Sequence, residues 1–407
     1  MNKFLTNNIS LILKVYLYFQ VLIDLLTGIM INHFHVNVTI GIIIRGLFLL
    51  LILYYYIFVN KNTTRAKFFY LLGVILFSII FIIVTIVSKD ISVLYFESSQ
   101  LFKIFYFAIL LTIIDSKDID IDLEDFVNIA ILYLVLIFVP NVFNISYNSY
   151  TQGKVGSVGL FNSGNEISAI LSILNPILVY YIFHNKNKLK KILLSLLMAV
   201  TYFKIGSKII IISLIISIIF NLIMYFKNNK DRGKKYIILI VIVILLLLGI
   251  FLLPKTNFYY NIILHLNYLG INNIIDVFSY NFINRFIFSD RLMFLITNFN
   301  NYINSGFFGI LFGVGFIHNY ATDIVSTKLV EMDLFDILFS LGIIGFSLYM
   351  MPLLNSIKVV FEKKKNVLIK FSILMALVIS VLVGHTLVAP SVSLLIVFIF
   401  KYRNKIK

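Results

Sequence analysis

Two lysines close together in the chain could bind an anion. Lys204 and Lys208 flank the sequence Ile-Gly-Ser, and Gly206 permits a tight turn between two apolar stretches. A helix N-terminus with lysines beside it suits a phosphate group. Alternatively, both side chains extend along a membrane surface, with apolar stems in lipid and ammonium groups in water. The residues leave both interpretations open.

A second group of charges lies late in the chain. Arg285 and Arg291 flank Asp290 and are six residues apart, which on a helix puts them on neighbouring faces. A glycine-rich stretch, residues 309–318, follows and ends in His318; it lacks the Lys-Ser/Thr of a nucleotide-binding loop. Three carboxylates then open the next apolar stretch, where acidic residues commonly stabilise a helix start: Glu331, Asp333 and Asp336.

Three of the charged residues within apolar stretches lie at a similar depth. Asp24, Arg45 and Glu97 are predicted to share the same half of a membrane. Charges there are costly, so they usually face a partner or a cavity. One interpretation is a structural ion pair between Asp24 and Arg45, and the other is the wall of a polar cavity that opens outward.

Other chemistry is disfavoured. The chain has no cysteine, which excludes thiolate nucleophiles, disulfides and cysteine-based zinc sites. The histidines lack metal-ligand spacing, and the acidic run 118–122 belongs to a short polar loop. A formal net charge of +16 does not indicate nucleic-acid binding, because the basic residues lie in short loops and not on one soluble face. We predict neither a metal nor a cofactor.

The elements that must position these residues are membrane helices. Hydrophobic residues make up 60% of the chain and charged residues 13%, unlike an average soluble domain. Apolar stretches of about twenty residues, enough to cross a bilayer, recur along the sequence. We predict an all-α polytopic integral membrane protein with about 12 transmembrane helices, at residues 11–30, 38–59, 68–88, 92–114, 124–144, 164–184, 190–204, 208–226, 236–254, 331–355, 366–384 and 387–401.

The distribution of basic residues predicts the orientation. Most of the 34 Lys and Arg fall in loops that face the cytoplasm if both termini do, and short cytoplasmic loops hold such residues in excess. Residues 145–163 and 255–330 would then face outward. We predict a single membrane domain, 1–407, in which 255–330 is a large extracytoplasmic segment with short helices lying against the membrane.

Several ordered features between about residues 155 and 350 suggest a family. Residues 159–166 read Gly-Leu-Phe-Asn-Ser-Gly-Asn-Glu, residues 205–208 read Ile-Gly-Ser-Lys, and Asp290-Arg291 precedes Leu-Phe-Gly-Val-Gly at 311–315. Their order resembles the O-antigen polymerase and ligase superfamily, the Wzy-type membrane glycosyltransferases. The family has Arg where this chain has Lys208. It often has His-Asn where this chain has the segment 331–333, so Glu331, Asp333 and His318 are alternative bases.

The resemblance implies transfer of an oligosaccharide from a polyprenyl diphosphate, such as undecaprenyl diphosphate, to an acceptor sugar hydroxyl at the outer leaflet. Cations would stabilise the diphosphate leaving group, and a carboxylate or histidine would accept the hydroxyl proton. The candidate catalytic residues are Glu331, Asp333, His318 and Arg291. The candidate substrate-binding residues are Lys204, Lys208, Arg285, Asn162 and Asn165.

The resemblance leaves the exact reaction open. A polymerase of cell-surface polysaccharide, O-antigen, capsule or exopolysaccharide is the first interpretation, and a ligase that moves finished glycan to another acceptor is the second. A lipid-linked oligosaccharide flippase or other transporter is a third, although transporters place polar residues near the membrane midplane. Expected partners are the lipid-linked oligosaccharide, membrane lipid, and a flippase and chain-length regulator. The expected location is the cell (plasma or inner) membrane.

Overall fold

The computed structural model describes residues 2–36, 40–60, 64–89, 91–148, 156–228, 279–317, 329–362, 366–382, 384 and 386–403. These residues form helices and turns, and they contain no strand. The predicted all-α class is confirmed.

The first half of the chain contributes α1 (Asn2–Asn32), α2 (Ile40–Tyr54) with the π-helix η1 (Tyr55–Val59), α3 (Arg65–Ser88), η2 (Ile91–Val93), α4 (Leu94–Ile113), η3 (Ser116–Asp118), α5 (Leu123–Val142), α6 (Gly164–His184), α7 (Lys188–Ile205) and α8 (Lys208–Asn228). The second half contributes α11 (Tyr280–Phe282), η6 (Ile283–Ile287), α12 (Arg291–Asn304), α13 (Gly306–Phe312), α15 (Asp333–Glu362), α16 (Val367–Leu382) and α17 (Pro390–Lys401).

Eight helical stretches within the described residues are long and apolar enough to cross a membrane. They comprise α1, α2 with η1, α3, α4 with η2, α5, α6, α8 and α15, and the shorter helices α16 and α17 are also apolar. The predicted span 190–204 is the helix α7, which falls outside this set because four of its 18 residues are lysine. The predicted span 236–254 lies outside the described residues.

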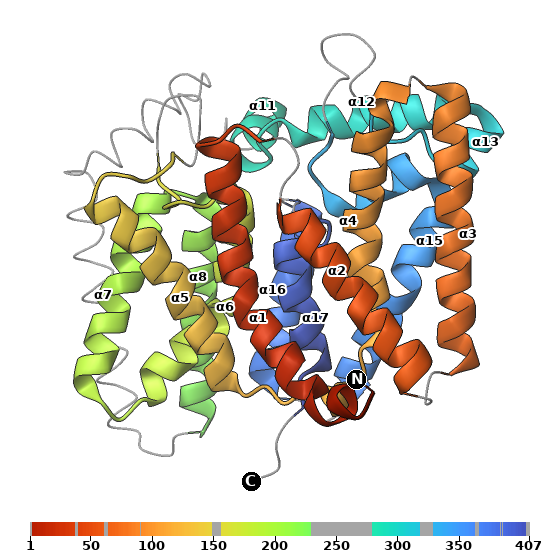
Figure 1. Cartoon of the computed structure of the whole chain (residues 1–407). Coiled ribbons are helices and arrows are strands. Elements are labelled where there is room, and N and C mark those ends of the chain that lie inside the picture. The colour runs from red at the N-terminus through yellow and green to blue at the C-terminus, as the bar shows by residue number, and fades with distance from the viewer. Residues whose placement is uncertain are drawn as a thin grey trace.

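The short helices lie together at one end of the bundle. Figure 1 shows α11, α12 and α13 across the upper end, whereas α1 begins and α17 ends at the lower end. We call the upper end the α12 end. Helices α11, α12 and α13, which belong to segment 255–330, thus lie across the ends of the membrane helices.

Two helices illustrate the difference between core and periphery. In α6, residues 167–179 are buried without interruption, so this helix lies inside the bundle. In α3, large apolar side chains remain exposed at Ile75, Ile79, Ile83 and Val87, a spacing that places them on one helix face. Such a face suits contact with lipid tails, which are as apolar as the side chains.

A break in α15 receives the glycine-rich stretch. Gly342 has φ +66° within the helix, which frees carbonyl groups one turn earlier. The N–H groups of Val314 and Gly315 donate to the carbonyls of Phe339 and Ser340, each at 3.0 Å. A Cβ on Gly342 would lie 2.4 Å from the backbone N of residue 313, so only glycine permits this approach.

Glu97 anchors the end of the same stretch. Its carboxylate is fully buried and accepts hydrogen bonds from the N–H groups of Phe316 and Ile317, each at 2.9 Å. Lys89 pairs with it at 2.5 Å. The carboxylate is satisfied by these three partners, so Glu97 stabilises the fold at the α12 end.

Candidate active site

Arg291 and Glu331 form an ion pair at the α12 end. Nη2 of Arg291 lies 3.0 Å from Oε2 of Glu331. The Arg291 side chain is 10% exposed and the Glu331 side chain 24%. Charges interact more strongly when they are partly removed from water than at an open surface. The structure therefore brings together two residues to which the sequence assigned different roles, a cation and a base.

A strained turn fixes Arg291. Ser289 and Asp290 have left-handed backbone conformations, with φ of +52° and +66°. Asn284 clamps the turn: its carbonyl accepts from the N–H of Asp290 at 2.8 Å, and its side-chain amide donates to Oδ1 of Asp290 at 3.2 Å. The clamp sets the point at which Arg291 begins α12.

The backbone of Glu331 is also left-handed, with φ +61°. Val330 and Met332 on either side are buried in a small cluster with Tyr302 of α12. A Cβ on Gly384 would lie 2.1 Å from the carbonyl oxygen of Glu331, so the loop before α17 packs directly on this residue. Unfavourable backbone conformations persist where the surroundings over-determine them, and they concentrate at functional sites.

The next two carboxylates are held by backbone N–H groups. Oδ2 of Asp333 accepts from Thr386 at 2.9 Å and from Leu387 at 2.7 Å. The two oxygens of Asp336 accept from N–H groups in segment 330–332, at 2.9 and 3.1 Å. These bonds tie the start of α15 to the loop before α17 and to the segment that carries Glu331.

A cavity of about 490 Å³ lies beside this segment. Residues of α1, α2, α4, α6 and α17 and the start of α15 line it. Most of them lie in the halves of these helices nearest the α12 end (Figure 1). Arg291 and Glu331 are not among the lining residues that the structure describes. The charged residues that line the cavity are Asp24, Arg45, Lys103, Glu166, Asp333 and Asp336.

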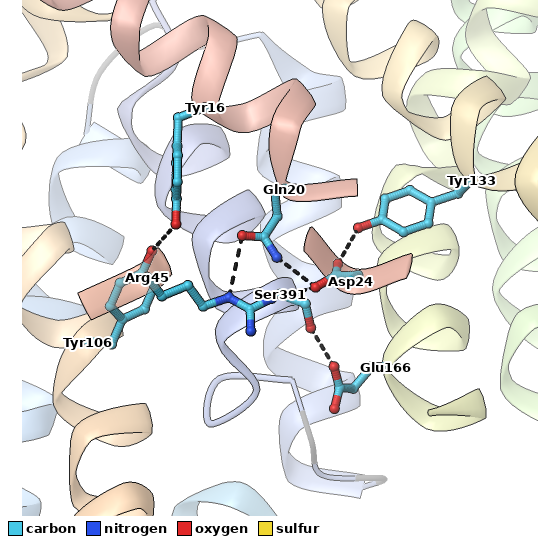
Figure 2. A network of polar contacts seen from close by, with 8 residues as sticks. All are labelled: Tyr16, Gln20, Asp24, Arg45, Tyr106, Tyr133, Glu166 and Ser391. Carbon is cyan, nitrogen blue, oxygen red and sulfur yellow. Dashed lines mark hydrogen bonds and ion pairs between the residues drawn. The ribbon is translucent and has the colours of Figure 1, made fainter. Parts of the chain in front are cut away.

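Figure 2 shows the polar network on one wall of the cavity. Arg45 forms an ion pair with Asp24, and its Nε donates to Oε1 of Gln20 at 3.4 Å. Asp24 also accepts hydrogen bonds from Gln20 and from the hydroxyl of Tyr133, each at 2.7 Å. The predicted ion pair is confirmed, and both of its members also line the cavity, so the two interpretations of Asp24 and Arg45 are compatible.

Lys204 and Lys208 lie at the turn between α7 and α8. Gly206 ends α7 with φ +69°, which is the predicted tight turn. The carbonyl of Lys204 accepts from the N–H of Ser157 at 2.8 Å, so the segment before α6 packs on this turn. Both lysines are exposed, and neither is among the residues that line the 490 Å³ cavity.

The remaining candidates fall in different places. Asn162 lines the cavity, because a glycine at position 28 lets the segment before α6 approach α1: a Cβ there would lie 2.2 Å from the carbonyl of Leu160. Asn165, in the first turn of α6, is half-buried and does not line the cavity in the described structure. Arg285 is exposed, and its Nε lies 3.8 Å from Asp290. His318 lies outside the described residues.

A comparison with protein families identifies the broad class. The family described as O-antigen ligase like membrane protein matches residues 6–273 and 279–403. The chain belongs to this family. It is therefore a multi-pass membrane protein with a role in glycan transfer, and the resemblance inferred from the ordered motifs is confirmed. No curated protein matches the sequence.

Two charged residues that line the cavity, Lys103 and Glu166, are not among the site residues predicted from the sequence. Lys103 lies within a predicted span, and an ionisable residue there is itself a signal of a cavity. Glu166 belongs to the motif at 159–166 but is not among the predicted site residues. Ser391, whose hydroxyl donates to Oε2 of Glu166 at 2.5 Å, has no distinguishing feature in the sequence.

Proposed function

We propose that the protein is a polysaccharide polymerase. It transfers an oligosaccharide from a polyprenyl diphosphate to a hydroxyl group of an acceptor sugar at the outer leaflet of the cell membrane. Both termini face the cytoplasm in this proposal, and the α12 end faces outward, which agrees with the distribution of basic residues. Membership of the O-antigen ligase-like family supports the transfer of a glycan.

The observation that carries the proposal is the incomplete bonding of Arg291. Its Nη2 pairs with Glu331, whereas its buried Nε has no hydrogen-bond partner in the described structure. A buried donor without a partner is uncommon in proteins, and a bound water or ligand atom can supply the missing hydrogen bond. A diphosphate oxygen suits it, because guanidinium groups bind phosphates through several fixed donors.

The reaction assigns a role to each member of the pair. The acceptor hydroxyl gives its proton to Glu331 while its oxygen forms a bond to the anomeric carbon of the donor sugar. The bond from that carbon to the diphosphate breaks, and the electron pair leaves with the diphosphate. Arg291, with Lys208, stabilises the negative charge on this leaving group. Lys204, Arg285, Asn162 and Asn165 are further binding residues in the proposal.

Two residues remain alternative bases. Asp333 is the first, but two backbone N–H groups already occupy one of its oxygens. His318 is the second.

Partner proteins also belong to the proposal. A flippase would deliver the lipid-linked substrate, and a chain-length regulator would set the polymer length. The family description favours a ligase as the second candidate function, and the two functions differ in their products.

Purified protein in lipid vesicles, supplied with lipid-linked repeat units, tests the proposal. We expect Arg291→Ala to lower the transfer rate about 10²–10³-fold, the usual effect of losing one preorganised donor to a developing anion. Arg291→Lys should rescue transfer partly, because lysine cannot form the planar double contact. Arg65→Ala, at an exposed site at the start of α3, is the matched control and should leave the rate unchanged.

The products separate the outcomes. A ladder of polymer lengths supports a polymerase, whereas a single transfer that requires a lipid acceptor supports a ligase. Normal transfer by Arg291→Ala would contradict the role of this arginine.

A further inference from the structure

Most charges that line the 490 Å³ cavity are satisfied by the protein itself. Asp24 is paired with Arg45. Asp333 and Asp336 accept hydrogen bonds from backbone N–H groups. A charge that already has such partners gains little from a ligand. The two charged residues that remain are Lys103 and Glu166.

Lys103 and Glu166 face the cavity with unused bonding capacity. Within the described part of the chain, the Lys103 ammonium takes part in no hydrogen bond and no ion pair. Glu166 accepts one hydrogen bond, through Oε2, from Ser391 (Figure 2), and its Oε1 accepts none from the described residues. The two opposite charges line the same cavity but do not form an ion pair in the described structure. The cavity therefore presents a donor and an acceptor that a ligand can bind together.

We propose that Lys103 and Glu166 bind an uncharged sugar ring between them. Neighbouring hydroxyl groups of a sugar can accept a hydrogen bond from the ammonium and donate one to the carboxylate. Bonds to charged partners are stronger than bonds between neutral groups. The proposal rests on the proposed glycan transfer and adds a separate sugar subsite beside the Arg291–Glu331 pair.

The lining of the cavity fits a sugar better than a diphosphate. Four carboxylates and two cations are among its lining residues, so the formal charge of the lining is negative. This charge would repel a diphosphate. Tyr95, an exposed aromatic residue, also lines it and offers a flat apolar surface to the C–H face of a ring. The volume of about 490 Å³ is typical of a small-molecule site.

A cysteine in the cavity wall tests the subsite without transfer. Ser99 lines the cavity, and Ser99→Cys creates a single reactive thiol because the chain has no cysteine. The probe is the lipid-free repeat-unit oligosaccharide released from the cell's own polysaccharide. We expect it to slow maleimide labelling of the introduced cysteine, whereas inorganic pyrophosphate should not.

Further substitutions in the Ser99→Cys protein test the roles of Lys103 and Glu166. Lys103→Met and Glu166→Gln should each raise the oligosaccharide concentration needed for half-protection at least about tenfold, the loss of one charged hydrogen bond. Lys190→Met, at an exposed lysine of α7, is the matched control and should change nothing. Thermal unfolding of each variant verifies that it is folded.

Transfer assays separate the two sources of the sugar. If the acceptor sugar occupies the subsite, Lys103→Met raises KM for the acceptor, and if the donor sugar occupies it, KM for the donor rises.

The proposal is wrong if the oligosaccharide does not slow labelling of the cysteine in the Ser99→Cys variant that carries no other change. It is also wrong if pyrophosphate gives protection that disappears with Lys103→Met, because the cavity would then bind the diphosphate. Full transfer by Arg291→Ala with intact oligosaccharide protection would instead reject the proposed diphosphate site and leave the sugar subsite standing.

Discussion

Two of the arginine–carboxylate pairs in the described structure are partly or fully buried, and their surroundings differ. Arg45 pairs with Asp24 inside the membrane helices, and its Nε donates to Gln20. Arg291 pairs with Glu331 between α12 and the segment before α15, and its Nε has no partner in the described structure. The first pair is completed by the protein, whereas the second leaves a donor for a ligand.

The backbone differs in the same way. Asp24 and Arg45 lie within the regular helices α1 and α2. Glu331 and the residue before Arg291 have left-handed conformations, which few non-glycine residues adopt. A regular helix holds a pair at no extra cost in strain. Strain at the second pair indicates that its position serves something other than stability.

The largest expected effect is that of Glu331→Gln on catalysis. A general base contributes about 10²–10⁴-fold to a reaction rate, and the amide cannot take the proton. The change is nearly isosteric, and the amide oxygen can still accept from Nη2 of Arg291, so stability should fall by only about 1–3 kcal/mol, the effect of removing one charge from a hydrogen bond. Transfer from lipid-linked repeat units, with single units accumulating, is the measurement.

The control for this variant is its own unfolding curve. Transfer at the normal rate would show that Glu331 only positions Arg291. A loss of transfer that parallels a loss of folded protein would assign this pair the same structural role as Asp24 and Arg45.

Arg45→Ala should have the second largest effect, this time on stability. The variant leaves Asp24 buried without its counter-charge, which typically costs about 3–5 kcal/mol. Arg45→Ala combined with Asp24→Asn removes both charges and should recover most of the loss. Thermal unfolding in detergent measures both variants. If Arg45→Ala unfolds like the wild type but stops transfer, the inner pair is catalytic and the contrast between the two pairs disappears.

The fold followed from the sequence because each membrane helix has to be apolar along its length. The glycines at 309–318 were visible in the sequence, but it did not show that this stretch packs on a break in α15. The partner of that stretch was not predictable: Gly342 is far away in the sequence, and its left-handed conformation appears only in three dimensions.

The site was predictable in its residue types but not in its connections. The sequence indicates Arg291 and Glu331 as separate candidates, and none of its features predicts that the two side chains meet. Glu331 and Asp333 looked equivalent as carboxylates at a helix start. The structure separates them, because Glu331 meets a guanidinium and Asp333 meets backbone N–H groups. The position of Lys103 inside an apolar stretch is a signal of a cavity, but the other residues of that cavity come together only when several helices pack.

Asp333→Asn should have the smallest effect and extends the comparison to a third carboxylate. The amide oxygen can still accept from the loop before α17, but these bonds lose their charge, so we expect a loss of about 1–3 kcal/mol of stability. Transfer per folded molecule should fall far less than with Glu331→Gln, because the hydrogen bonds from backbone N–H groups to Oδ2 give Asp333 a structural role.

The transfer rates of three variants, each divided by the folded fraction, identify the base. The variants are Asp333→Asn, Glu331→Gln and His318→Ala. If Asp333→Asn alone stops transfer, Asp333 is the base. If both carboxylate variants transfer normally and only His318→Ala fails, the base is His318, and the pair of Arg291 and Glu331 serves to bind the diphosphate.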